Sequence, residues 1–169
     1  MSQLAFVRDL YRHMQWADAE IWRALAAKPE VLSDPQLLDL VRHIHSVQRS
    51  FLLMWTNTPL DQKDIDGQRE PDVLRERARS YYAEADAFLT RVEPEMLSEI
   101  VVMPWLQHFA ERLGRPLQAP TLADTLLQLP AHSTYHRGQA NLRLRELGGE
   151  PPLVDYIAWV WFGRPEPHW

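Results

Sequence analysis

The sequence predicts an all-α protein folded as an antiparallel four-helix bundle, and three observations support this fold class. Apolar residues recur at three- and four-residue spacing along four long segments, which is the period of a helix with one buried face. Capping residues and helix breakers separate these segments. The joining segments are modest in length, so we expect neighbouring helices to pack antiparallel and strand content to be close to nil.

The first two helices follow from their apolar positions and from the residues at their ends. Residues 4–27 form the first helix, which Pro29 helps to end. Ser33 or Asp34 caps the second helix, and Pro35 lies in its first turn, where a missing N–H costs little. The apolar positions of the second helix are Leu37, Leu40, Ile44, Val47, Phe51 and Met54 or Trp55.

An irregular segment separates the third and fourth helices. A polar loop is predicted over 57–67, and the third helix follows over 71–92. Residues 100–103 form a short run rich in β-branched side chains, which is typical of an extended segment. Helix breakers then follow at Gly114, Pro116 and Pro120.

The fourth helix and the tail complete the predicted fold. Thr121 and Asp124 have the spacing of a capping box, and the helix continues to about residue 147, where two glycines end it. Pro130 lies inside this helix, removes one backbone hydrogen bond and predicts a kink. The Pro- and Trp-rich tail over 151–169 is expected to wrap over the bundle.

Composition limits the classes of function. The chain has 169 residues, one domain's length, and a formal net charge of −5, which argues against binding nucleic acid. It has no cysteine, so disulfides, Cys-ligated zinc and a protein thiolate nucleophile are excluded. The N-terminus lacks the layout of a signal peptide, and no apolar run approaches the roughly 20 residues of a membrane span. We therefore expect a soluble, cytoplasmic protein with no membrane partner.

Two histidines on the fourth helix are the first candidate metal ligands. His132 and His136 are four residues apart, so their imidazoles lie on one helix face about one turn apart. Two such rings can reach a single divalent ion, as in the His-x-x-x-His helices of zinc enzymes. The spacing alone is weak evidence, because the chain holds 7 histidines.

The second helix offers two candidates for a third ligand. His43 and His45 point to different sides, since two residues of helix turn through about 200°. His43 lies on the side of Val47 and Phe51, so we expect it to face the bundle interior, whereas His45 lies nearer the flank. The alternative is that one is a buried histidine bonded to backbone and the other lies on the surface.

Three motifs resemble one family over nearly the whole chain. The most specific is His132-Ser-Thr-Tyr-His136-Arg137-Gly138-Gln139, followed by Leu-Arg-Glu-Leu-Gly-Gly-Glu-Pro-Pro and Asp155-Tyr-Ile. It closely resembles the C-terminal signature of the DinB-like (DinB/YfiT) four-helix metalloproteins. The second-helix motif resembles His43-Ile-His-Ser-Val-Gln48 of this chain, and a first-helix motif is similar to His13-Met-Gln-Trp16-Ala-Asp18. On this resemblance residues 1–169 form a single DinB-like metal-binding domain.

The resemblance implies a metal triad of one histidine from the second helix and two from the fourth. Matching the motifs gives His43, His132 and His136, with His45 as the alternative for the first. Three neutral imidazoles leave a position for water or substrate, which is typical of a catalytic ion. Imidazole suits zinc, nickel and iron, so the sequence does not identify the one divalent ion.

Five neighbouring residues complete the candidate site. Arg137 and Gln139 either orient a ligand or substrate, or bridge between helices. Tyr135 either forms a hydrogen bond near the metal or belongs to the core. Gln48 stands where relatives often carry an acidic residue, and Trp16 is expected to line the bundle interior. No catalytic side chain is identified.

The implied reaction is metal-dependent chemistry on a small molecule. Characterised relatives include S-transferases and isomerases in which the metal activates a low-molecular-weight thiol, so thiol transfer is the favoured prediction. A hydrolase is an alternative, but Ser133 stands where zinc proteases place a Glu general base, and Asp124 lies two turns upstream of His132. The other alternative is a non-catalytic metal-binding or stress-response module. The resemblance also implies a homodimer.

Overall fold

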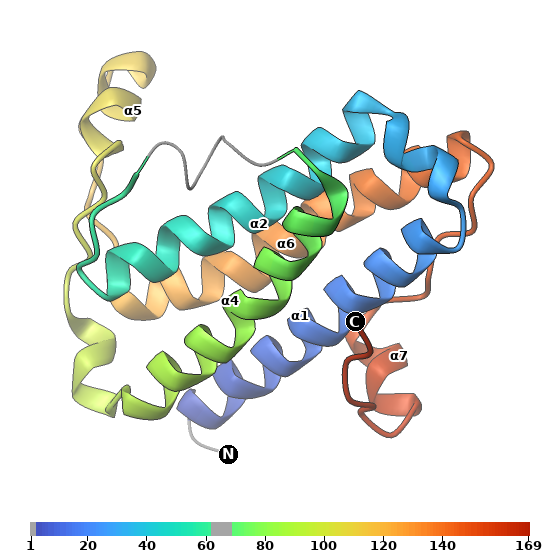
Figure 1. The fold of residues 1–169 in the computed structure, drawn as a ribbon. Helices are drawn as coiled ribbons and strands as arrows, with labels where there is room; N and C mark the ends of the chain where they lie inside the picture. The colour runs from blue at the N-terminus through green and yellow to red at the C-terminus, as the bar shows by residue number, and fades with distance from the viewer. Residues whose placement is uncertain (1–2, 62–68) are drawn as a thin grey trace.

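The computed structural model describes residues 3–61 and 69–169, and its regular structure is helical throughout those ranges. Four long helices pack together (Figure 1): α1 (Gln3–Ala26), α2 (Pro35–Trp55), α4 (Pro71–Arg91) and α6 (Leu122–Glu146). Within the described ranges, β pairing is limited to an isolated bridge between Ile100 and Thr121. The all-α prediction is therefore confirmed. Part of the loop predicted over 57–67 lies outside the described residues.

The packing of the helices places α2 against α6. These two share the most extensive contact among the long helices, while α1 contacts α6 and α4, and α2 contacts α4. In Figure 1, α1 and α6 run in one direction and α2 and α4 in the other. The pairs α2/α6 and α1/α4 are therefore antiparallel as expected, whereas the contacting pairs α1/α6 and α2/α4 run parallel. The α2/α6 pair is the one that brings the candidate histidines together.

Shorter helices lie at the ends of the bundle. They are η1 (Pro29–Ser33), η2 (Pro94–Ser98), α5 (Leu106–Leu113) and α7 (Tyr156–Trp161). The segment predicted to be irregular holds α5, which ends at Gly114 with φ +65°. No residue of α5 is buried, and Figure 1 shows this helix projecting beyond the body of the bundle.

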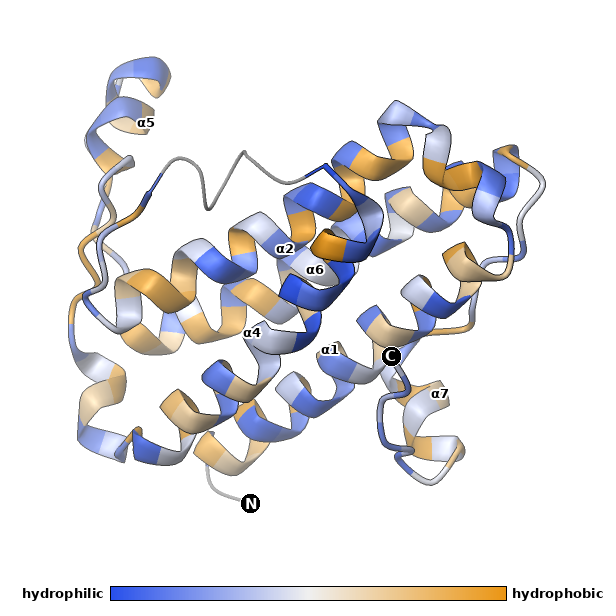
Figure 2. Ribbon diagram, in the orientation of Figure 1, coloured by the Kyte–Doolittle hydropathy of each residue, from blue (hydrophilic) through white to orange (hydrophobic). Residues whose placement is uncertain are grey.

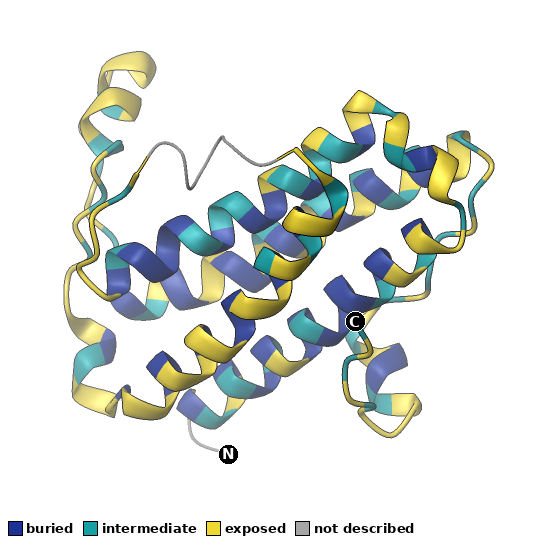
Figure 3. Cartoon of the chain, viewed as in Figure 1, coloured by how far each residue is buried: buried dark blue, intermediate teal, exposed yellow. Residues whose placement is uncertain are grey.

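The core fills the space between the four long helices. Figure 2 shows apolar and polar residues alternating along each helix, and Figure 3 shows buried residues on the sides that face one another. Fully buried apolar side chains include Met14, Leu25, Leu37, Leu126 and Leu129. Burial of such a side chain contributes about 1.5–3 kcal/mol, so this shared interior is what holds the helices together.

The predicted helix ends are confirmed. Asp34 caps α2, because its carboxylate accepts a hydrogen bond from the Leu37 N–H at 2.8 Å. Thr121 and Asp124 form the capping box of α6. After α6 the chain turns at Gly148, whose φ of +74° favours glycine.

Pro130 lies inside α6 without ending it. A proline has no N–H, so the carbonyl of Leu126, four residues earlier, loses its helical donor. The hydroxyl of Tyr11 donates to that carbonyl at 3.3 Å. A side chain of α1 thus satisfies the backbone group that Pro130 releases, close to the turn that carries His132.

The tail covers α1, as predicted. Trp159 of α7 is buried against Trp16 and Ala17, and the ring of Trp169 lies 5.8 Å from that of Tyr82. Trp161, by contrast, is exposed. None of the described helices is both long enough and apolar enough to cross a membrane.

Candidate metal centre

Three histidines from α2 and α6 lie together at the surface of this helix pair. Each of His43, His132 and His136 offers a ring nitrogen, and these nitrogens lie within 4.8 Å of one another. The Nε2 atoms of His43 and His132 are 3.2 Å apart. In a tetrahedral zinc site, ligand nitrogens are about 3.3 Å apart, so the group could hold a divalent ion. The structure thus brings the predicted triad together.

The surroundings of His43 and His132 favour the neutral form of their imidazoles. Burial, together with His136 and His43, lowers the pKa of His132 to about 4. Burial, His136 and Arg42 also lower the pKa of His43. A metal ion binds the unprotonated nitrogen, so these shifts favour the form that a metal requires.

Gln139 fixes the orientation of one ligand. Its side-chain oxygen lies 2.7 Å from Nδ1 of His136. A carboxamide oxygen can only accept, so Nδ1 carries the ring proton and Nε2 keeps its lone pair. Metal-binding histidines usually have a supporting hydrogen bond of this kind, and the orienting role considered for Gln139 stays a prediction.

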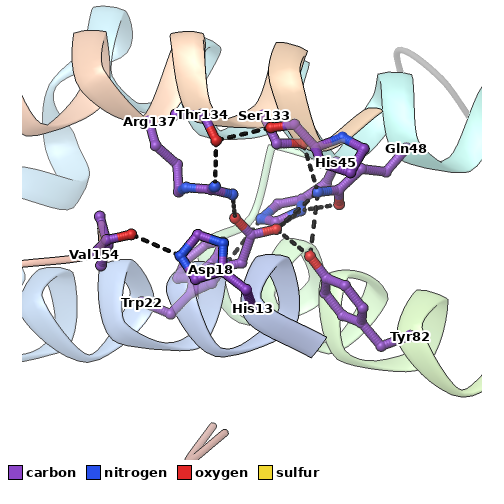
Figure 4. A network of polar contacts seen from close by, with 11 residues as sticks. His13, Asp18, Trp22, His45, Gln48, Tyr82, Ser133, Thr134, Arg137 and Val154 are labelled. Atoms are coloured by element: carbon purple, nitrogen blue, oxygen red, sulfur yellow. Dashed lines mark hydrogen bonds and ion pairs between the residues drawn. The ribbon is translucent and has the colours of Figure 1, made fainter. Parts of the chain in front are cut away.

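His45 belongs to a different cluster, a buried polar network (Figure 4). Its Nε2 accepts from the Trp22 indole at 3.0 Å, and its Nδ1 bonds the Gln48 side-chain oxygen at 2.9 Å. Both ring nitrogens are therefore engaged within the protein. This arrangement selects His43 over His45 as the α2 member of the candidate triad.

The expected orientations of these two histidines were wrong. His45 is buried, whereas His43 lies at the edge of the bundle and is partly exposed. The inner face of α2 is centred on Val41, His45 and Gln48, because α6 and α4 cover that side. The apolar pattern misassigned this face, since polar residues occupy two of its buried positions.

Asp18 of α1 lies at the centre of the network. Its two carboxylate oxygens accept from Arg137 at 2.8 Å and from Gln48 at 2.8 Å, and Oδ2 also accepts from the Tyr82 hydroxyl. Burial alone would raise the pKa of Asp18, but Arg137, His45 and the hydrogen bonds hold it below its usual value. Asp18 and Arg137 are each 2% exposed, so this is an ion pair inside the bundle.

Arg137 and Gln48, which were predicted to lie beside the metal, belong instead to the buried network. Arg137 points to Asp18 rather than to the triad, and it also donates to the Thr134 hydroxyl at 2.9 Å. Gln48 donates to Ser133 at 3.1 Å as well as to Asp18. Both residues therefore bridge helices, which was the alternative considered for Arg137.

Two further expectations are corrected by the structure. Tyr135 is exposed rather than part of the core, and its ring stands edge-on to His136 at 5.0 Å. Trp16 is buried beneath the tail, beside Trp159, and does not line the site. Sequence reasoning also missed Asp18, although a carboxylate next to the apolar positions of the first helix was a sign of a buried charge.

A pocket of about 510 Å³ adjoins the triad, and His43 and His132 form part of its wall. The triad therefore lies beside a cavity in the size range of small-molecule sites.

A sequence model of the DinB family matches residues 1–166. The chain belongs to the DinB family. Protein DinB of Bacillus subtilis (strain 168) is 26% identical to this DinB-family chain over 180 residues, which cover 98% of this chain and 99% of the relative. The family resemblance drawn from the three motifs is thus confirmed.

Proposed function

We propose that this DinB-family chain is a metal-dependent enzyme that acts on a small molecule by transfer of a low-molecular-weight thiol. The observation that carries the proposal is a group of three imidazoles, two of which line a pocket. Three protein ligands leave a four-coordinate ion one position for an exogenous group. A purely structural ion would instead be enclosed by protein ligands.

His43, His132 and His136 would hold the ion. A bound divalent ion lowers the pKa of a coordinated thiol or water and so favours the anionic form at neutral pH. The chain's own contribution is to present three uncharged ligands, which leave the positive charge of the site available to a thiolate. Gln139 contributes by holding the proton of His136 at Nδ1.

The hydrogen bonds of two side chains favour thiol transfer over hydrolysis. Ser133, at the position of the zinc-protease Glu, is fully buried and accepts from Gln48. The carboxylate of Asp124 accepts from the backbone and hydroxyl of Thr121 at 2.8 and 2.7 Å. Ser133 is therefore held inside the bundle, and Asp124, which also lines the pocket, is tied to the start of α6 through Oδ2.

The buried network argues against a purely structural metal. It links α1, α2, α4 and α6 through the interior without involving the triad. We therefore expect the bundle to stay folded at room temperature after chelation, with its stability lowered only by the binding free energy of the ion. Unfolding of the bundle on chelation would favour the non-catalytic, metal-organised module instead.

The test begins with elemental analysis of natively purified protein, which should contain about one divalent ion per chain. The protein loaded with that metal is then assayed for conjugation of low-molecular-weight thiols to electrophiles, with His136→Ala as the metal-deficient control. Activity that tracks metal content supports the proposal. A stoichiometric ion with no thiol-dependent activity above the His136→Ala background rejects thiol transfer.

We also propose a homodimer. The outward face of α6 carries the exposed side chains of Leu127, Tyr135 and Leu142 at helical spacing, and such a stripe is typical of an interface. Sedimentation that finds a species of twice 19.8 kDa supports the dimer, whereas a monomer alone excludes it.

A further inference from the structure

The pocket beside the triad has an apolar wall built from separate parts of the chain. Its apolar lining consists of Val47, Phe51, Met103, Trp105, Phe109 and Pro120. The first two come from α2, and the others come from the segment that leads into α5, from α5 itself and from the segment that leads into α6. The segment predicted to be irregular, before the fourth helix, therefore forms much of this wall.

Two of the polar side chains that line the pocket, those of Asp124 and Thr125, form hydrogen bonds within the protein. The Thr125 hydroxyl accepts from the Trp55 indole at 3.0 Å and donates to the Leu122 carbonyl at 2.9 Å. Asp124 caps its own helix. The lining residues, all within the described ranges, include no lysine or arginine. The walls thus provide no counter-charge for an anionic group, which would need one in so apolar a space.

Phe109 shows that the wall is incompletely covered by the protein. This side chain faces the pocket, yet the residue is 42% exposed. The neighbouring Trp105 is held edge-on to Phe51 at 6.2 Å, so part of the apolar wall has a fixed place. An apolar ligand would remove the ring of Phe109 from water and gain the corresponding hydrophobic free energy.

We propose that this pocket binds the apolar, aromatic-sized part of a neutral small molecule, which makes hydrophobic neutral compounds the substrate class of the site. The volume of about 510 Å³ accommodates such a group within the usual range of ligand pockets. Because His43 and His132 belong to the same wall, the reacting end of the molecule would lie at the triad. The inference rests on the proposed function for that reacting end.

The first experiment tests the pocket without a metal. The full chain, stripped with EDTA, is titrated with N-phenylnaphthylamine, a neutral aromatic probe that fluoresces in apolar surroundings. We expect a saturable increase in fluorescence with one site per chain. No increase means that the pocket is closed or filled, by a second copy for example, and overturns the inference.

The second experiment uses the cobalt(II) protein and three thiols. The dissociation constants of benzyl mercaptan, β-mercaptoethanol and thioglycolate are measured from the thiolate-to-cobalt absorption band. Benzyl mercaptan should bind at least about tenfold more tightly than the other two, since only its ring gains from burial. Equal dissociation constants for the three thiols overturn the proposal that the pocket binds an apolar group and leave the proposed metal site unaffected. Probe binding without any cobalt spectrum overturns the proposed function and leaves the pocket standing.

Variants assign the effect to this wall. Phe109→Ser and Val47→Asn, on different helices, should each weaken N-phenylnaphthylamine and benzyl mercaptan by about threefold or more and leave β-mercaptoethanol unchanged. Trp161→Ser is the matched control, because Trp161 is an exposed aromatic residue of α7 outside the pocket lining. Circular dichroism checks that each variant is folded. Unchanged ligand affinity in a folded pocket variant, or an equal loss in the control, overturns the inference.

Discussion

His43 and His45 lie two residues apart on α2 and belong to two unlike polar clusters. His43 joins His132 and His136 in a partly exposed group of imidazoles beside a pocket. His45 is sealed among Trp22, Gln48 and the Asp18 ion pair. In the first cluster the nitrogens face one another, which suits an added ion. In the second, hydrogen bonds use both nitrogens, so the cluster is complete within the protein.

The same alternation occurs along α6, and it links the two clusters. His132 and His136 belong to the triad. The residue that follows each of them, Ser133 and Arg137, forms hydrogen bonds within the buried network. Because Arg137 is paired with Asp18 inside the bundle, the network holds α6 in one rotation about its axis. The geometry of the open site therefore depends on the closed one.

The largest expected effect separates the two α2 histidines. His43→Ala should reduce bound metal from about one ion per chain to near zero, with the metal-free stability changed by no more than about 0.5 kcal/mol. His45→Ala should keep the metal but lower the free energy of unfolding by about 2–4 kcal/mol, because it leaves buried partners unpaired. Elemental analysis measures the bound metal, and urea unfolding measures the free energy of unfolding. Metal loss in His45→Ala with retention in His43→Ala would reverse the assignment.

The next effect tests the network as a structural element. Asp18→Asn or Arg137→Met leaves one buried charge without its partner and should lower the free energy of unfolding by about 3–5 kcal/mol. The double variant Asp18→Asn/Arg137→Met should recover much of this loss, because no unpaired charge remains. Denaturant unfolding of all four proteins gives the coupling. Additive losses would show that the pair is not the source of the effect.

A smaller effect concerns the support of the triad. Gln139→Leu removes the acceptor at Nδ1 of His136 and should weaken metal binding by about tenfold to a hundredfold. Gln139→Glu keeps an acceptor and is the matched control, with affinity retained. Competition with a chromophoric chelator measures both. Equal affinities for the Leu variant and the wild type would remove Gln139 from the site.

The smallest effect is the response of the metal-free protein to acid. His132 titrates near 6.5 in the unfolded chain and at about 4 in the folded one. As the pH falls below 6.5, His132 becomes protonated in the unfolded chain but stays neutral in the folded chain. The free energy of unfolding therefore decreases as the pH falls from 6.5 toward 4. Solvent screening makes the loss modest, since the ring is partly exposed. The urea midpoint in EDTA should therefore fall less steeply with pH in His132→Asn than in the wild type.

The helices and their caps were predictable because they depend on neighbours in the sequence. Asp34, Thr121 and Asp124 lie within one turn of the backbone groups they cap, and the four-residue spacing of His132 and His136 fixes a shared face. Tyr135 and Trp16 were misplaced because a periodic pattern does not reveal what covers each side of a helix. The pocket was not foreseen, since its walls are far apart in the chain.

By itself, the sequence determined the four long helices, their ends, the family and the three histidines that match its motif. The tertiary structure alone decided which way α2 faces, and with it which histidine is sealed and which is open. The physical reason is that burial of a polar residue depends on its partners. Gln48 and Arg137 occupy interior positions because Asp18, from a distant helix, accepts their hydrogen bonds there. His45 is buried beside them because Trp22 and Gln48 bond its two ring nitrogens.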